Sequence, residues 1–167
     1  IVTWMQEKTS PVFIVATAND VRILPAELLR KGRFDEIFFL SLPTEKERKA
    51  IFKVHLQKLR PARLREFNLD LLARQTKDFS GAEIEQVIFD AMYQAFADVD
   101  EQQQRRDFTD MDIVRAAETT VPLAAIAKET IDNLKLWAAQ AGARPASHDT
   151  EITEALRNYL RDRGLPE

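Results

Sequence analysis

The sequence has no cysteine and only four glycines among its 167 residues. Without cysteine the chain can form no disulfide, thiol nucleophile or zinc–thiolate site. The glycines, at positions 32, 81, 142 and 164, do not form the G-x(4)-G-K-[ST] pattern whose backbone amides cradle phosphates. No apolar run approaches the roughly 20 residues of a membrane span, and no basic-plus-apolar signal segment opens the chain. We therefore expect a cytoplasmic protein with no membrane partner.

The composition is that of an ordinary globular protein, with 45% hydrophobic and 31% charged residues. The formal net charge of -3 argues against nucleic acid as a partner, because binding to phosphates needs a clustered positive field. One local basic cluster stands out, formed by Arg60, Arg63 and Arg65. We expect it to be a solvated loop, with a contact to a partner as the alternative.

The first forty residues read as part of a parallel sheet. Residues 12–16 form a continuously apolar run, as in a strand buried on both faces. Asn19 follows this run, at the carboxyl end where open α/β sheets bind ligands. A short helix over residues 25–30 and a second apolar strand over residues 36–40 come next. Because this is too little sheet to stand alone, we expect the chain to begin inside a larger domain.

From Pro43 onward the patterns are helical. Capping boxes, in which a hydroxyl and a carboxylate three residues later satisfy free backbone amides, predict helices that begin after Thr44 and Ser80. Asn68 and Thr109 begin two more, and residues 98–107 form a solvated connection. Amphipathic patterns predict further helices over residues 122–140 and from about residue 149 to residue 163. The expected fold class is an α/β fragment followed by an all-α part.

One motif is specific. Asn19 is followed eleven and fourteen residues later by Arg30 and Arg33, within the segment Leu-Leu-Arg-Lys-Gly-Arg-Phe-Asp. This arrangement resembles the second region of homology of AAA-family ATPases. The resemblance implies that residues 1–42 are the end of an αβ nucleotide-binding subdomain, that residues 43–120 are its helical lid, and that residues 121–167 are a helical extension.

In that family the strand-tip asparagine, called sensor 1, helps to position the attacking water, and two arginines reach into the nucleotide site of a neighbouring subunit. The resemblance therefore implies catalytic roles for Asn19, Arg30 and Arg33. Two structural alternatives stay open. Asn19 could simply cap a turn, and Arg33 could pair with Asp35 in its own chain.

The resemblance also implies nucleotide contacts from the lid. His55, four residues after Ile51, matches a histidine that lies by the ribose, and Gly81 with Ala82 matches a pair that packs near the adenine. The alternative for His55 is an ordinary core or surface histidine. No arginine begins the helix that follows Ser80, so the sensor 2 arginine of other branches is absent, which indicates the core AAA clade.

The tail, with Val121-Pro122-Leu123 and Ala143-Arg144-Pro145, resembles an AAA ATPase of cyanobacteria, algal plastids and other bacteria. The resemblance implies ATP hydrolysis in a homo-oligomeric ring of six that remodels an unknown protein substrate. ATP and Mg²⁺ are the implied cofactors, with the magnesium ligands outside this chain, so this chain alone should not be active. The alternatives are a non-hydrolysing helical interaction module that keeps an AAA remnant, and a helical DNA-binding domain, which the acidic balance opposes.

Overall fold

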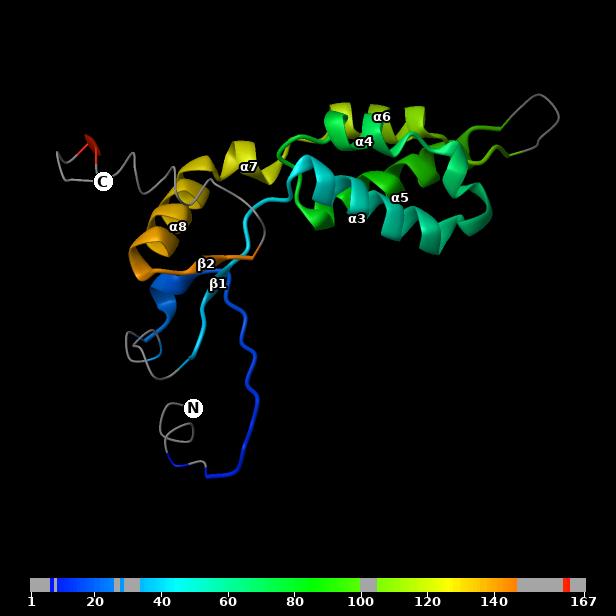
Figure 1. Cartoon of the computed structure of the whole chain (residues 1–167). Coiled ribbons are helices and arrows are strands. Elements are labelled where there is room, and N and C mark those ends of the chain that lie inside the picture. Colours follow the sequence, from blue (N-terminus) through cyan, green and yellow to red (C-terminus); the bar gives the residue numbers. More distant parts are fainter. Residues whose placement is uncertain are drawn as a thin grey trace. The chain divides into compact units, whose positions relative to one another are not determined.

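The computed structural model describes residues 7, 9–25, 28, 34–99, 105–146 and 161–162 (Figure 1). The chain divides into two compact units, one formed by residues 1–40 with 132–167 and the other by residues 41–131. The first unit carries a short parallel sheet, and the second is helical. The predicted fold class, an α/β fragment followed by helices, is confirmed. This division into two compact units does not test the three predicted domains, and these remain a prediction.

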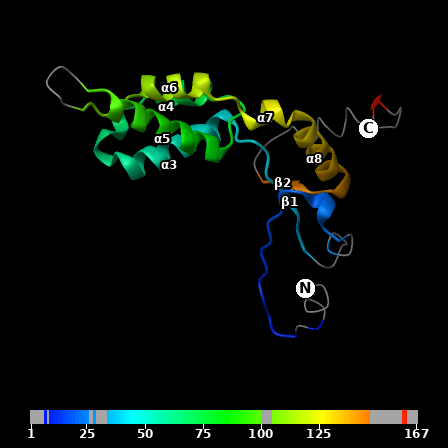
Figure 2. The ribbon, with the colours of Figure 1, turned by 180° about the vertical axis from the view of Figure 1, so that it is seen from behind.

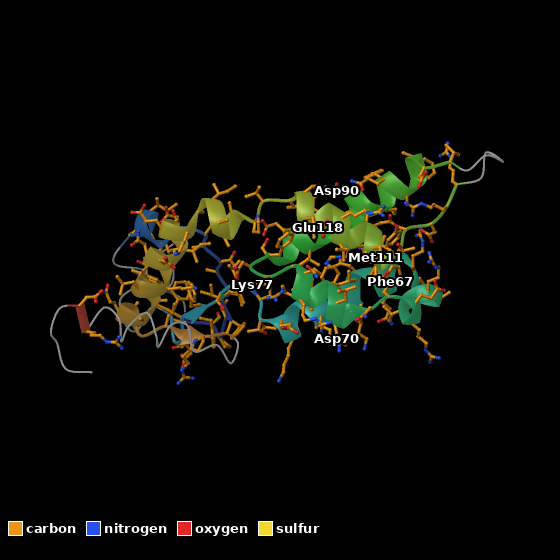
Figure 3. All side chains as sticks on the ribbon, turned by 90° about the horizontal axis from the view of Figure 1, so that it is seen from above. Phe67, Asp70, Lys77, Asp90, Met111 and Glu118 are labelled. Atoms are coloured by element: carbon orange, nitrogen blue, oxygen red, sulfur yellow. The ribbon has the colours of Figure 1, made fainter. Side chains whose placement is uncertain are left out.

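Helices α3, α4, α5 and α6 form the body of the helical unit and lie side by side in both views (Figures 1 and 2). The elements of this unit, in chain order, are α3 (Glu45–Leu59), the 3-10 helix η2 (Pro61–Glu66), α4 (Leu69–Gln75), α5 (Gly81–Ala97), α6 (Asp110–Thr119) and α7 (Leu123–Ile126). Helix α6 turns Met111 and Glu118 to the outside (Figure 3).

The apolar face of α5 forms the centre of this unit. Its buried residues recur at helical spacing, which places them in one stripe: Ile84, Val87, Ile88, Ala91 and Ala95. Helix α5 packs against both α3 and α6, and buried residues of those helices belong to the same core: Phe52, Leu56, Ile113, Val114, Ala116 and Ala117.

The helix starts predicted at Thr44, Asn68, Ser80 and Thr109 are confirmed. In the capping box of α3, the Thr44 amide donates to Glu47 Oε2 at 2.8 Å. In that of α5, the Ser80 amide donates to Glu83 Oε2 at 2.7 Å. Asn68 Oδ1 accepts from the Leu71 amide at 3.0 Å and caps α4.

The prediction of a solvated loop for the arginine cluster is wrong for two of its three residues. Arg60 Nε and Arg63 Nη1 each lie 2.7 Å from Asp107 Oδ2. The hydrogen bond from Arg60, and to a smaller extent that from Arg63, lowers the pKa of Asp107 below its usual value. The guanidinium of Arg60 also lies over the ring of Phe108, 5.5 Å from its centroid. The partner carboxylate is 47 residues from Arg60, so no local pattern could indicate the pairing.

In the other unit, β1 (Phe38–Phe39) pairs in parallel with β2 (Arg144–Pro145). The amides of Arg144 and Ala146 donate to the carbonyls of Ile37 and Phe39, both at 2.9 Å. The strand predicted over residues 36–40 is thus confirmed in a shorter form. Its partner in the tail was not predicted.

Helix α8 (Lys128–Ala141) leads into β2 through a turn that needs glycine. Gly142 has φ 69°, a left-handed conformation that costs other residues roughly 1–2 kcal/mol. The Ala143 amide donates to the Ala138 carbonyl at 2.9 Å and the Gly142 amide to the Ala139 carbonyl at 3.2 Å, which together form a Schellman motif. Ala138 and Ala143 then pack with Ile37, Phe39, Trp137 and Ala139.

Two other predictions differ from the structure. Residues 12–16 form no strand, and Phe13 is 93% exposed. A strand needs neighbours for its backbone groups, and the ladder of the described residues joins β1 to β2 instead. The helix predicted over residues 122–140 is interrupted at Ala127, where φ is -107° and ψ is 27°, and so divides into α7 and α8.

Two predicted helices lie largely outside the described residues. In the segment predicted over residues 25–30, Leu28 is helical, and the 3-10 helix η1 (Val21–Ile23) precedes it. Of the last predicted helix, residues 161 and 162 are described and helical. Within the described part of the chain, no helix has the length and apolarity needed to cross a membrane.

An ion pair at the start of α6 stabilises the helical unit. Arg106 donates to both carboxylate oxygens of Asp112, at 2.7 and 2.9 Å, and Asp112 also accepts from the Thr109 amide at 2.8 Å. The Asp112 side chain is 6% exposed, while that of Arg106 is 40% exposed. Hydrogen bonds from Arg106 outweigh burial and hold the pKa of Asp112 well below its usual value.

Replacing Asp112 with asparagine should lower the free energy of unfolding of the chain by about 2 kcal/mol near neutral pH. The reason is that Arg106, which is partly exposed, loses its charge-assisted hydrogen bonds with the Asp112 carboxylate. Because the folded-state pKa is depressed, this contribution is present above the ordinary carboxyl pKa of ~3.9 and is lost as the pH falls below it. Urea unfolding should therefore show a gap between wild type and Asp112→Asn that narrows in acid. The control Asp110→Asn, at the same helix end, should cost less than about 1 kcal/mol. Equal losses in both variants would assign the effect to the helix terminus instead of the ion pair.

Candidate functional site

The first turn of α5 and the facing side of α3 bring two of the predicted lid contacts together. Gly81 is the first residue of α5. A Cβ atom placed on it would lie 3.8 Å from Ile51 Cδ1, an ordinary contact distance. Ile51 is half-buried and Ala82 is exposed. The glycine therefore offers an open backbone surface beside an apolar side chain.

His55 lies one helical turn after Ile51 on the same side of α3. Its Nδ1 is 3.4 Å from Glu85 Oε1 on α5, and the two side chains are 25% and 46% exposed. The imidazole thus has one nitrogen near a carboxylate and remains accessible to solvent. Neither the approach of His55 to Glu85 nor the nearness of Ile51 to Gly81 could be read from the sequence pattern, because the residues of each pair are about thirty positions apart.

Glu83 fixes the geometry of the same turn. Its Oε2 accepts from the Ser80 amide at 2.7 Å, its Oε1 accepts from the Leu123 amide at 2.6 Å, and its own amide donates to Ser80 Oγ at 3.3 Å. Burial alone would raise the pKa of Glu83, but these hydrogen bonds outweigh it and the pKa is lowered. The carboxylate is therefore charged at neutral pH.

The chemistry available at this surface is binding chemistry. An apolar side chain, an open backbone turn and an imidazole can contact a flat heterocycle and a hydroxyl group. Among the residues that the structure describes, no group of three or more histidine or acidic side chains could hold a metal ion.

Of the three predicted catalytic residues, the structure describes Asn19. Asn19 is exposed at a bend just before η1. Arg30 and Arg33 lie outside the described residues. Asp35, the alternative partner of Arg33, is exposed. The roles of Asn19 and the two arginines, and of the four lid residues, stay predictions.

Two family models match the chain in the order of an AAA module. The model described as "ATPase family associated with various cellular activities (AAA)" matches residues 1–42, and the model described as "AAA+ lid domain" matches residues 66–110. The chain belongs to the AAA family and carries the C-terminal part of its nucleotide-binding module.

The relatives agree with this assignment. The uncharacterized AAA domain-containing protein ycf46 of Guillardia theta is 49% identical over 146 residues, which are 87% of this chain and 28% of that protein. The ATP-dependent zinc metalloprotease FtsH of Karelsulcia muelleri is 38% identical over 99 residues, 59% of this chain and 16% of that protein. The proteasome-activating nucleotidase of Saccharolobus solfataricus is 42% identical over 87 residues, 52% of this chain and 22% of that protein.

The chain thus spans little more than a quarter of the length of the Guillardia theta relative. Similarity to the ycf46 protein confirms the predicted resemblance to plastid-type AAA proteins. No solved structure matches the chain.

Gly81 can be tested because its packing does not require glycine. We expect Gly81→Ala to leave the free energy of unfolding of this chain within about 1 kcal/mol of wild type, since the added methyl group meets only Ile51 at contact distance and alanine is the better helix former. Gly142→Ala is the matched control, and its left-handed backbone should make it cost roughly 1–2 kcal/mol.

In the longer protein, Gly81→Ala should raise the KM for ATP if the turn touches the nucleoside. Urea unfolding and steady-state ATPase assays check the two halves of this prediction. A large loss of stability would show that the lid itself needs the glycine, and an unchanged KM would remove Gly81 from the nucleotide site.

Proposed function

We propose that the longer protein hydrolyses ATP to ADP and phosphate, and that this chain supplies the residues that complete the active site. The observation that carries the proposal is the order of the two family matches, an AAA segment at residues 1–42 followed by a lid at residues 66–110. Within the first match, Asn19, Arg30 and Arg33 stand at the spacing of sensor 1 and two arginine fingers. The names of the FtsH and nucleotidase relatives refer to ATP dependence and nucleotide hydrolysis, which supports an ATPase reaction.

Phosphoryl transfer to water needs an oriented nucleophile and positive charge near the oxygens of the transferred group. In this proposal the Asn19 amide orients the attacking water. The guanidinium groups of Arg30 and Arg33 donate to phosphate oxygens of the neighbouring subunit's nucleotide, for which their planar donor geometry is suited. Mg²⁺ neutralises phosphate charge when bound, and its ligands and the phosphate loop are expected upstream of residue 1.

The lid contributes binding. Ile51, Gly81 and Ala82 contact the adenine side of the nucleoside, and His55 contacts the ribose. The nearness of Ile51 to Gly81 and the 3.4 Å approach of His55 Nδ1 to Glu85 Oε1 support this role, because they place residues of α3 and α5 at one surface. A homo-oligomeric ring, expected to contain six subunits, acts on a protein substrate in the cytoplasm.

Arg33→Ala in the longer protein should leave ATP binding nearly unchanged and reduce turnover roughly 10³–10⁵-fold, as the loss of a finger does in other nucleotide hydrolases. Arg30→Ala should be similar or somewhat milder. The physical reason is that a finger contacts the developing charge in the transition state more strongly than the ground-state nucleotide. Nucleotide titration and steady-state ATPase assays measure the two effects.

Mixing experiments decide whether the arginines act across an interface. The Arg33→Ala protein is mixed with a second variant that has intact arginines but cannot bind ATP. Some activity should return, because a good nucleotide site then meets a good finger at one interface. If mixed rings form and stay inactive, Arg33 acts within its own chain and pairing with Asp35 becomes the better assignment. A wild-type protein that binds no ATP would favour the non-hydrolysing interaction module.

A further inference from the structure

The tail of the chain is joined to the start of α5 by one hydrogen bond that crosses forty residues of sequence. The amide of Leu123 donates to Glu83 Oε1 at 2.6 Å. The other carboxylate oxygen, Oε2, accepts from the Ser80 amide at 2.7 Å. Glu83 therefore closes the Ser80–Glu83 turn and holds the tail with the same side chain.

This carboxylate is a natural partner for the Leu123 amide. Leu123 is the first residue of α7, and the first amides of a helix have no acceptor within the helix. A charged acceptor at this position strengthens the bond. The leucine side chain, by contrast, is 57% exposed. The backbone amide, and not the side chain, makes the connection.

We infer that Glu83 is a positioning residue of the nucleotide site and that the Leu123 amide, supplied by the tail, is part of what holds it. The inference rests on the proposed function, in which Gly81 and Ala82 contact the nucleoside. These two residues lie between Ser80 and Glu83, so any change in the carboxylate changes the turn that presents their backbone. The tail thereby contributes to ATP binding without touching ATP.

Leu123→Pro removes this hydrogen bond and little else. Proline lacks the amide hydrogen, and the first position of a helix tolerates it. Pro122 has φ -60° and ψ 139°, an extended conformation that a following proline accepts. Leu123→Ala is the matched control, because it keeps the amide and removes the exposed side chain.

In the longer protein, Leu123→Pro should raise the KM for ATP about fivefold, the change that corresponds to one net hydrogen bond. The kcat should stay within about twofold of wild type, since the inference gives the tail no part in the chemical step. Leu123→Ala should match wild type in both. Thermal unfolding of the three proteins accompanies the kinetics, and equal melting temperatures would separate positioning from a general loss of folding.

Two results would overturn the inference while leaving the ATPase proposal intact: an active Leu123→Pro protein with an unchanged KM, or equal KM changes in Leu123→Pro and Leu123→Ala. A wild-type protein that neither binds nor hydrolyses ATP would instead end the proposed function, and the inference with it.

A second pair of variants keeps the test decisive if Leu123→Pro does not fold. Glu83→Gln removes the charge and leaves one acceptor oxygen for two amides, so it should also raise the KM for ATP several-fold with kcat little changed. The control is Glu118→Gln, which neutralises an exposed carboxylate on α6 (Figure 3) and should leave both constants unchanged. A Glu83→Gln protein with wild-type KM would contradict the positioning role.

Discussion

Burial of one face of α5 is the constraint on which the helical unit depends. Ile84, Val87 and Ile88 are fully buried, and each such side chain contributes roughly 1.5–3 kcal/mol relative to exposure. Because this face packs against both α3 and α6, the same packing fixes the direction of α5 and the position of its first turn. That turn carries Gly81 and Ala82, the residues proposed to meet the nucleoside. Core packing thus positions a surface that itself contains few large side chains.

Three carboxylates hold the loops and helix ends of the helical unit. Glu83 accepts from the Leu123 amide, Asp107 pairs with Arg63, and Asp112 accepts from Arg106. Each has its pKa lowered by those bonds. Arg48 is instead a charged donor. Its nearly buried guanidinium donates to the carbonyls of Ala73 and Pro43 at 3.0 and 2.7 Å. Loops and helix ends are therefore held by charged groups where the apolar core stops.

Local patterns predicted the parts of the fold whose causes are local. The caps at Thr44, Asn68 and Ser80 depend on residues three positions apart, and all three were predicted. The run over residues 12–16 has strand composition but lacks a paired strand among the described residues, and a strand cannot be judged without its neighbours. The pairing of β1 with the tail and the bond from Leu123 to Glu83 join distant segments, which no periodicity reveals. The site residues came from the family resemblance, and for Ile51 and Gly81 the structure adds proximity.

The most direct test is an experimental structure of the longer protein, assembled as proposed, with a non-hydrolysable ATP analogue. Arg33 should then reach a phosphate of the neighbouring subunit at about 3 Å, the distance of a charge-assisted hydrogen bond. Asn19 should face the γ-phosphate of its own subunit, and the nucleoside should lie against His55 and the first turn of α5. A nucleotide bound away from α5, with Arg33 paired to Asp35 of its own chain, would contradict the claim that this chain completes an ATP site between subunits.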